Sequence, residues 1–180
     1  IDIWVASFNS NEYASGTLYV TELDYNPSNL PGSSGGGGTL DYTQSPNYGE
    51  VSLSAGFLPD PYTVNLLSGG DVDVGSLGLG GCYGYATAAP DFRLQWSGSS
   101  SRLRFFFVAD NPGEDATLIV NDAYTAWHCN DDYSGLDPLV EIQNPPQGQY
   151  DIWVGSYGSG VYIQGTLYIT EQDYHPGYHP

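Results

Sequence analysis

The residues that follow Cys129 have the types and the spacing best suited to bind a cation. In the run NDDYSGLDP (130–138), oxygen-bearing side chains alternate along the chain before a glycine. Oxygen ligands at alternate positions before a glycine that allows a sharp turn are typical of the first half of a calcium loop. Pro138 and the strand-like residues after it do not fit the flanking helix of an EF-hand, and an Asx-rich turn between two strands explains the pattern equally well. The candidate Ca²⁺ ligands are Asn130, Asp131, Asp132, Ser134 and Asp137.

The rest of the chain offers little to an enzyme. Of the three histidines, His128 stands beside Cys129, and neighbours on a strand point to opposite faces, so the two do not form a catalytic pair. The one match to the G-x-S-x-G pattern, GSSGG (32–36), lies in the Gly/Ser/Pro-rich linker and does not indicate a nucleophile elbow, which joins a strand to a helix. The glycine-rich segments also lack the lysine of a phosphate loop. His175 and His179, in the C-terminal run HPGYHP, suit weak transition-metal binding or a frayed tail. We therefore expect no catalytic residues and no enzyme activity.

Charge and composition exclude further classes. The chain has 180 residues with 3 Lys+Arg, all of them arginine, against 21 Asp+Glu, and its formal net charge is −18. Because nucleic-acid binding relies on cations that neutralise phosphates, and anionic membranes repel the same charge, neither is an expected partner. Aromatic residues make up 14% of the chain, which is too much apolar surface for a disordered one. No apolar run approaches the roughly 20 residues of a membrane-spanning helix.

Residues 1–27 and 150–176 are two copies of one segment. The first reads IDIWVASFNSNEYASGTLYVTELDYNP and the second YDIWVGSYGSGVYIQGTLYITEQDYHP, with 16 of 27 positions identical and no gap. In each copy a DIWV strand, a polar turn and a GTLYxTE strand predict a β-hairpin. Alternation in the second strand places Leu18 and Val20 on one face and Tyr19 on the other.

Turn signals separate short strand-like runs from about residue 46 onward. We predict strands near 50–54, 61–67, 71–74, 92–96, 102–109, 116–120, 124–129, 138–142, 150–157 and 164–171. Regular short strands between such turns favour an all-β fold, a jelly-roll-like β-sandwich with an additional N-terminal hairpin or donor strand on a flexible linker. The predicted organisation is a hairpin at 1–25 that repeats 150–174, a Gly/Ser/Pro-rich linker at 26–45, the sandwich at 46–174 and a C-terminal tail at 175–180.

The first copy of the repeat is surplus, because the domain at 46–174 ends with its own copy. It is the tail of a preceding tandem repeat, a hairpin packed on its own domain, or a segment that leaves on the linker to complete a sheet in a neighbouring subunit. A lone hairpin is marginally stable in water, so its apolar side chains must dock on something. The candidate assembly residues are Ile3, Trp4, Val5, Phe8, Leu18 and Val20.

The two cysteines, Cys82 and Cys129, do not form a CxxC motif, so neither a zinc knuckle nor a thioredoxin-type site is indicated. As a disulfide they would stabilise the fold by about 4 kcal/mol in the chain-entropy model, and as free thiols they would be buried side chains of an intracellular protein. An acidic, lysine-free chain rich in Gly, Ser and Tyr fits an extracellular location better.

Much of 46–174 resembles a family of secreted bacterial β-domains, the pre-peptidase C-terminal domains. The resemblance lies in PNYGEVSLSAGFLPDPYTV (46–64), GGCYGY (80–85), APDFRLQW (89–96), ATLIVNDAYTAWHCNDDYSGLDPLVEI (116–142) and GQYDIWVGSY (148–157), and residues 1–27 match the closing hairpin of that family. It implies a β-sandwich, a Cys82–Cys129 disulfide and a cation-friendly acidic turn at Asp131, Asp132 and Asp137. Such domains often follow trypsin-like serine proteases, but no protease motif occurs here. The chain is also similar to protomers of extracellular fibrils in which an N-terminal strand inserts into a neighbour.

These features predict a secreted or cell-surface structural subunit of an extracellular fibril, which self-assembles by inserting its N-terminal β segment into a neighbouring subunit. The alternative is a calcium-binding accessory or adhesion domain of a secreted multidomain protein such as a protease, with exposed tyrosines that stack on a polysaccharide. Copies of the chain itself are the expected partners, and Ca²⁺ is the candidate cofactor. Nucleic acid and membrane insertion are not expected.

Overall fold

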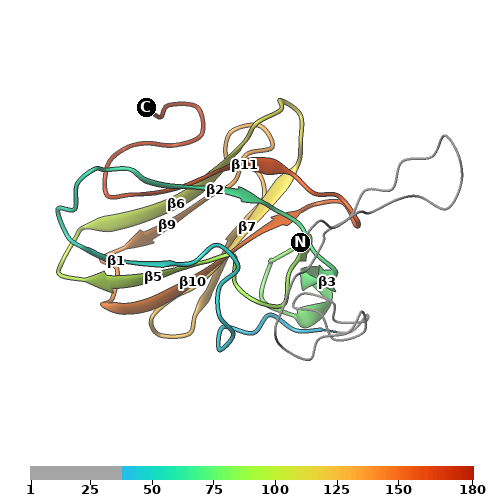
Figure 1. The fold of residues 1–180 in the computed structure, drawn as a ribbon, viewed down its shortest axis with the longest axis horizontal. Helices are drawn as coiled ribbons and strands as arrows, with labels where there is room; N and C mark the ends of the chain where they lie inside the picture. The colour runs from blue at the N-terminus through green and yellow to red at the C-terminus, as the bar shows by residue number, and fades with distance from the viewer. Residues whose placement is uncertain (1–37) are drawn as a thin grey trace, which may run out of the picture. The chain divides into compact units, whose positions relative to one another are not determined.

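Short strands, most of which alternate apolar and polar residues, build the part of the chain that the structure describes. The computed structural model describes residues 38–180 (Figure 1). One sheet has seven strands: β1 (Glu50–Ser54), β3 (Val72–Asp73), β4 (Tyr85–Ala86), β5 (Phe92–Ser97), β7 (Ala116–Asn121), β8 (Trp127–Asn130) and β10 (Gly148–Ser156). The other has four: β2 (Tyr62–Leu67), β6 (Arg102–Ala109), β9 (Leu139–Gln143) and β11 (Gln164–Thr170). The two sheets pack on each other, which confirms the predicted all-β sandwich.

The order of strands leaves β1 and β2 at sheet edges. The four-stranded sheet has the order β2-β11-β6-β9, and β11 runs antiparallel to both of its neighbours. In the seven-stranded sheet β1 pairs with β5, and β5 pairs with β10, which continues to β4 and β3 and also pairs with β7. The β1–β5 pair is parallel, whereas β5 and β10 are antiparallel. Thus β1 and β2 each have one hydrogen-bonded neighbour among the described strands.

Apolar side chains from both sheets meet in the main core. The strands alternate, so that every second side chain of β5 and β10 faces the other sheet. The core side chains of the seven-stranded sheet are Phe92, Leu94, Trp96, Leu118, Val120, Tyr150, Ile152 and Val154. Those of the four-stranded sheet are Leu66, Leu103, Phe105, Phe107, Val140, Ile142, Leu167 and Ile169.

A second apolar cluster covers the outer face of the seven-stranded sheet. It contains Leu40, Val72, Val74, Cys82, Ala86, Ile119 and Trp153. Between β3 and β4 the chain forms a 3-10 helix (Val74–Leu77), whose first turn is capped by the Asp73 carboxylate. Leu40 is only 5% exposed, and the Asp41 N–H donates to the Ala88 carbonyl at 2.8 Å. The last residues of the predicted linker therefore pack on the domain, which extends to before residue 46.

The second copy of the repeat, 150–174, forms an arch and not the predicted hairpin. Its two strands, β10 and β11, belong to different sheets and are not paired with each other. Ile152 of β10 and Leu167 of β11 both lie in the core between the sheets. Sequence alternation shows which face of each strand is apolar, but a hairpin and an arch place that face toward the core equally well.

Several predictions concern parts of the chain outside the described residues. The segment 1–25, its six candidate assembly residues and most of the linker are among them. No helix in the described range is long and apolar enough to cross a membrane.

Candidate functional site

The acidic loop lies between β8 and β9 and closes in a tight turn. Ser134 and Asp137 form an isolated bridge, in which each backbone N–H donates to the other residue's carbonyl, at 3.2 and 3.4 Å. Gly135 has a φ of 67°, a conformation that glycine adopts without a steric penalty. The residues whose spacing suggested a calcium loop thus form a turn between two strands, which was the alternative interpretation of the same sequence.

Two of the five candidate calcium ligands use side-chain oxygens inside the protein. The Oδ1 atom of Asn130 accepts from the Leu139 N–H at 2.9 Å, and Oδ1 of Asp137 accepts from the Ala109 N–H at 3.1 Å. Among residues 38–180, no group of three or more His, Cys, Asp and Glu side chains is gathered as metal ligands are. The calcium site stays a prediction.

Negative charge is concentrated where Asp115, in the turn between β6 and β7, lies near the acidic loop. Burial raises the pKa of Asp115 above its usual value, and the nearby carboxylates of Asp132 and Asp131 raise it further. Burial also raises the pKa of Asp137, which the Ala109 N–H and the charge of His179 offset only in part. A bound cation would relieve this repulsion, because it would favour the charged form of each carboxylate.

The C-terminal tail lies on the acidic loop and is not frayed, contrary to the expectation. Pro176 is buried, and His175 and Tyr178 exchange backbone hydrogen bonds at 3.0 and 2.8 Å. The His175 ring packs near Tyr133, with 5.9 Å between centroids. At the end of the tail, the His179 ring lies 4.9 Å from that of Tyr168 on β11. Both tail histidines are thus used in aromatic packing.

A Cys82–Cys129 disulfide is present, as the resemblance implies. It links the glycine-rich segment before β4 to β8, the strand that leads into the acidic loop. Beside it, the ring of Trp127 packs against that of Trp153, with centroids 5.4 Å apart. The disulfide therefore ties the second apolar cluster to an edge of the seven-stranded sheet.

His128 has the structural role that its place on an edge strand suggests. Its Nε2 lies 2.9 Å from Oδ2 of Asp122, whose other oxygen accepts from the N–H groups of Tyr124 and Ala126. Burial alone would raise the pKa of Asp122, but the hydrogen bonds from His128 and the two N–H groups outweigh it and lower that pKa. The pair holds the β7–β8 turn.

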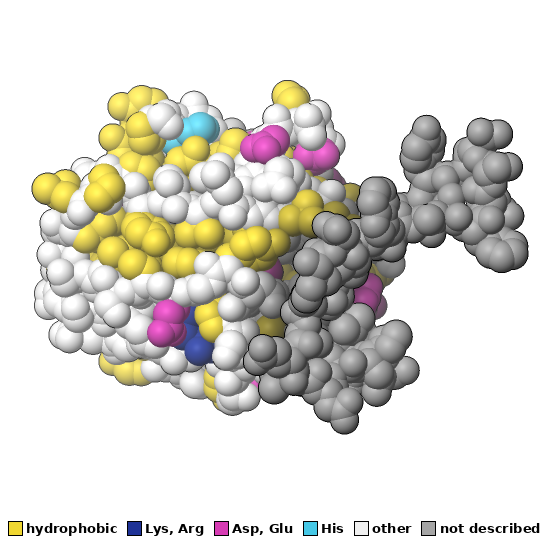
Figure 2. All heavy atoms as spheres, viewed as in Figure 1, with side chains coloured by type: hydrophobic (Ala, Val, Ile, Leu, Met, Phe, Trp, Pro, Cys, Tyr) yellow, Lys and Arg dark blue, Asp and Glu magenta, His cyan; other side chains and the backbone are white. Residues whose placement is uncertain are grey.

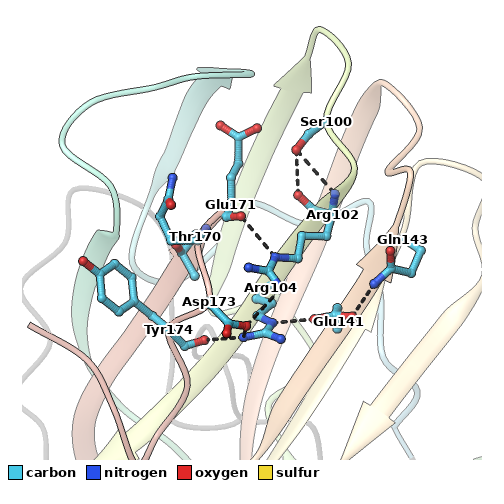
Figure 3. Close-up of polar contacts among 10 residues, drawn as sticks. Ser100, Arg102, Arg104, Glu141, Gln143, Thr170, Glu171, Asp173 and Tyr174 are labelled. Atoms are coloured by element: carbon cyan, nitrogen blue, oxygen red, sulfur yellow. Dashed lines mark hydrogen bonds and ion pairs between the residues drawn. The ribbon is translucent and has the colours of Figure 1, made fainter.

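Each arginine of the chain is held by a carboxylate of the same chain. Arg104 donates to Glu141 at 2.5 Å and lies 2.9 Å from Asp173, and its hydrogen bond lowers the pKa of Glu141 (Figure 3). Arg102 binds Asp173 at 3.0 Å and the Glu171 carbonyl at 3.2 Å.

The third arginine, Arg93, secures the chain that leads into the domain. It binds the largely buried Asp151 at 2.7 Å and donates to the carbonyls of Tyr42 and Gln44 at 2.7 and 2.9 Å. The carboxylates and carbonyls that the three arginines bind could not be predicted from the sequence, because each arginine stands in a strand far along the chain from its partners. All three arginines, the only Lys or Arg residues of the sequence, are thus engaged in ion pairs within the described domain.

The core is incompletely covered along a line that we call the seam: the strip between edge strands β1 and β2, lined by Val51, Leu53, Tyr62 and Val64. These four side chains pack against the core but are only half-buried, whereas Leu94 on neighbouring β5 is fully buried. Figure 2 shows a continuous band of hydrophobic side chains on the face where Figure 1 places β1 and β2. The seam is the feature that the sequence did not reveal.

The backbone edges along the seam also lack partners. The Arg93 N–H donates to the Gly49 carbonyl and the Ala55 N–H to the Ser97 carbonyl, so in β1 the odd-numbered residues face β5. The polar backbone groups of Ser52 therefore point away from the sheet. On β2, alternation directs the groups of Thr63 outward in the same way.

Within residues 38–180, the outward-pointing backbone N–H and C=O groups of Ser52 and Thr63 have no hydrogen-bond partner. At one end of the seam, the Tyr48 hydroxyl lies 3.1 and 3.2 Å from the N and O atoms of Leu67 and so occupies the edge of β2.

Comparisons with known proteins add little. No protein-family model and no curated protein match the chain. Among solved structures, it is similar to the pre-peptidase C-terminal domain of a collagenase from Bacillus anthracis, with 13% sequence identity and a TM-score of 0.36, over 67% of this chain and 92% of that chain. That neighbour comes from the family that the sequence resembles. At this TM-score the likeness carries no conclusion about what the chain does.

Proposed function

We propose that the chain is a non-enzymatic structural subunit that assembles into an extracellular fibril, in which residues 1–25 of one copy insert into the next. The observation that carries the proposal is the surplus copy of the repeat. The domain already contains the strands of its own copy, as β10 and β11, so the matching segment at 1–25 does not supply these two positions. A segment with this pattern is marginally stable alone and must bury its apolar face elsewhere.

The open seam supports the proposal from the recipient's side. Exposed edges with unpaired backbone groups and half-buried apolar side chains are templates for strand addition. When the donor and the recipient are different surfaces of identical molecules, the contact is head-to-tail, and it propagates into a filament unless a ring closes.

The Cys82–Cys129 disulfide supports an extracellular location, because disulfides persist in oxidising compartments. For the non-enzymatic part of the proposal, His128 and the three arginines make structural contacts: His128 with Asp122, and each arginine with a carboxylate.

The test compares two double variants of the full chain that add the same charge. Ile3→Asp with Leu18→Asp places carboxylates on the apolar face of the donor segment, and Asn9→Asp with Asn11→Asp places them in its polar turn. We expect filaments by electron microscopy for the wild type and for the turn variant, and monomers by gel filtration for the Ile3/Leu18 variant. Filaments of the Ile3/Leu18 variant, or a wild-type chain that stays monomeric, would contradict the proposal.

A second candidate is a calcium-binding accessory or adhesion domain of a secreted multidomain protein. It is favoured by exposed tyrosines, which suit stacking on a polysaccharide, and by the acidic loop. The most exposed tyrosines of the described chain are Tyr83, Tyr124, Tyr157, Tyr162 and Tyr178. Intact mass of the native protein separates the candidates, because this one requires a longer chain that carries further domains.

A further inference from the structure

We propose that the seam receives the donated segment, and that the segment enters as an arch. Residues 2–8 would add a strand beside β1, and residues 16–22 would add a strand beside β2, each extending a different sheet. The inference rests on the proposed function, and it adds the recipient site and the orientation of the donor.

The second copy of the repeat shows how this sequence uses its apolar residues. At the constant offset of 149, Ile3 and Val5 correspond to Ile152 and Val154 of β10. Likewise Leu18 and Val20 correspond to Leu167 and Ile169 of β11, and all four residues of the second copy are fully buried between the sheets. A donor with the same pattern therefore presents one apolar strand to each sheet. A recipient must offer one free edge of each sheet over the same core, as β1 and β2 do.

The strand directions agree with this placement. Since β10 runs antiparallel to β5, and β5 runs parallel to β1, a strand that keeps the direction of β10 lies antiparallel to β1. A strand that keeps the direction of β11 lies antiparallel to β2. The donor can thus pair with both edges at once in the orientation of its own copy, shifted across the sandwich beyond β1 and β2 (Figure 1). Neither strand has to reverse.

The chemistry of the seam suits a second copy of this chain. The two edge strands read EVSLS and YTVNLL, so Glu50 is their only charged residue, whereas the whole chain carries −18. Copies that repel one another approach with least repulsion where charges are sparse. The stretch from residue 26 to Leu40, where the chain packs on the domain, extends to at most about 50 Å, enough to reach a neighbour.

The test blocks each edge without removing a ladder hydrogen bond. Because the N–H groups of Ser52 and Thr63 point away from their sheets, Ser52→Pro and Thr63→Pro keep the β1–β5 and β2–β11 pairings. Gln143→Pro is the matched control, since Gln143 is exposed on β9, the opposite edge of the four-stranded sheet. Its N–H points away from β6, because the next residue, Asn144, donates its N–H to the Ser101 carbonyl. We expect each seam variant to raise the critical concentration for assembly at least about tenfold, the double variant to abolish filaments, and the control to match the wild type.

Hydrogen exchange supplies a readout that does not depend on a proline variant. The amides of Ser52 and Thr63 should exchange about 100-fold more slowly in wild-type filaments than in the full-length Ile3→Asp/Leu18→Asp chain. Protection that also appears in wild-type monomers would mean that the segment docks on its own chain, and it would overturn the inference.

The outcomes separate this inference from the proposed function. If the Ile3/Leu18 variant cannot assemble but both proline variants assemble normally, subunits do exchange the segment, and the seam is not its recipient. If the Ile3/Leu18 variant assembles, the proposed function itself fails. Unchanged exchange at Ser52 and Thr63 in filaments would refute the seam whatever the proline variants do.

Discussion

Asp91 is a buried carboxylate whose ionisation should make the fold less stable as the pH rises. It precedes β5 and is 1% exposed, and its Oδ2 atom accepts from the Val154 N–H of β10 at 2.8 Å. Its Oδ1 atom accepts from Asn47 at 3.2 Å. Burial raises the pKa of Asp91 from 3.8 to about 7, although the hydrogen bonds from Val154, Asn47 and Thr87 act in the opposite direction.

The sign and the size of the effect follow from this raised pKa. Between pH 4 and 7 the folded state binds a proton that the unfolded state has released, so the free energy of unfolding falls as the pH rises through this window. Below it both states are protonated, and above it both are ionised. At about 1.4 kcal/mol per pH unit the full effect is about 4 kcal/mol, of which about 2.5 kcal/mol falls between pH 5 and pH 8.

Asp91→Asn keeps an acceptor for the Val154 N–H and removes the ionisation. Urea unfolding of the full chain is measured at pH 5 and pH 8, at protein concentrations too low for assembly. From pH 5 to pH 8, the free energy of unfolding of the wild type should fall by about 2.5 kcal/mol more than that of Asp91→Asn. Asp71→Asn, at an exposed aspartate, removes the same formal charge and corrects for general repulsion. Parallel pH profiles of the wild type and Asp91→Asn would refute this reasoning.

Three further predictions concern the disulfide, the arginine cluster and the acidic loop. Replacing Cys82 and Cys129 by serine should lower the free energy of unfolding by about 4 kcal/mol, because their loop spans 47 residues, and the intact non-reduced wild type should weigh two hydrogens less than the dithiol. Arg104→Met should lower that free energy by about 2 kcal/mol, since it leaves Glu141 partly buried without its partner. Removal of Ca²⁺ by a chelator should lower the melting temperature, and Asp132→Ala should reproduce that loss.

Each of these has a defined counter-result. Two thiols that react with an alkylating reagent in the native protein would refute the disulfide. Equal free energies of unfolding for Arg104→Met and the wild type would show that the ion pair of Arg104 with Glu141 does not stabilise the fold. If melting and assembly do not respond to chelator or to Asp132→Ala, the loop binds no Ca²⁺ and is a turn.

The sequence predicted the sandwich well because most of its strands have a regular period. Long strands such as β6 and β11 occur close to their predicted bounds, since alternation and flanking turns mark them clearly. Two-residue β4 was missed, because a strand of that length has no period to detect. The second copy of the repeat was assigned to a hairpin because alternation identifies an apolar face but not the sheet that covers it.

The candidate sites were less predictable, because they depend on distant pairings. The seam exists because β1 pairs with β5 and β2 with β11, residues that lie over 40 and about 100 positions apart. The contact of the tail with the acidic loop, through His175 and Tyr133, is equally remote along the chain. The Asn130 and Asp137 side chains illustrate the limit of motif spacing, since it cannot show which oxygens already accept backbone N–H groups.

The internal pairing of Arg93, Arg102 and Arg104 determines how the chain behaves in an ionic solution. The excess of 18 negative charges is balanced by mobile counterions rather than by fixed cations that could reach another molecule. A fibre of such subunits would be a polyelectrolyte. The osmotic pressure of its counterions would keep neighbouring fibres apart at low salt, whereas divalent ions shared between carboxylates would draw them into bundles. The spacing between fibres would thus respond to the surrounding medium while the contacts along each fibre stay unchanged.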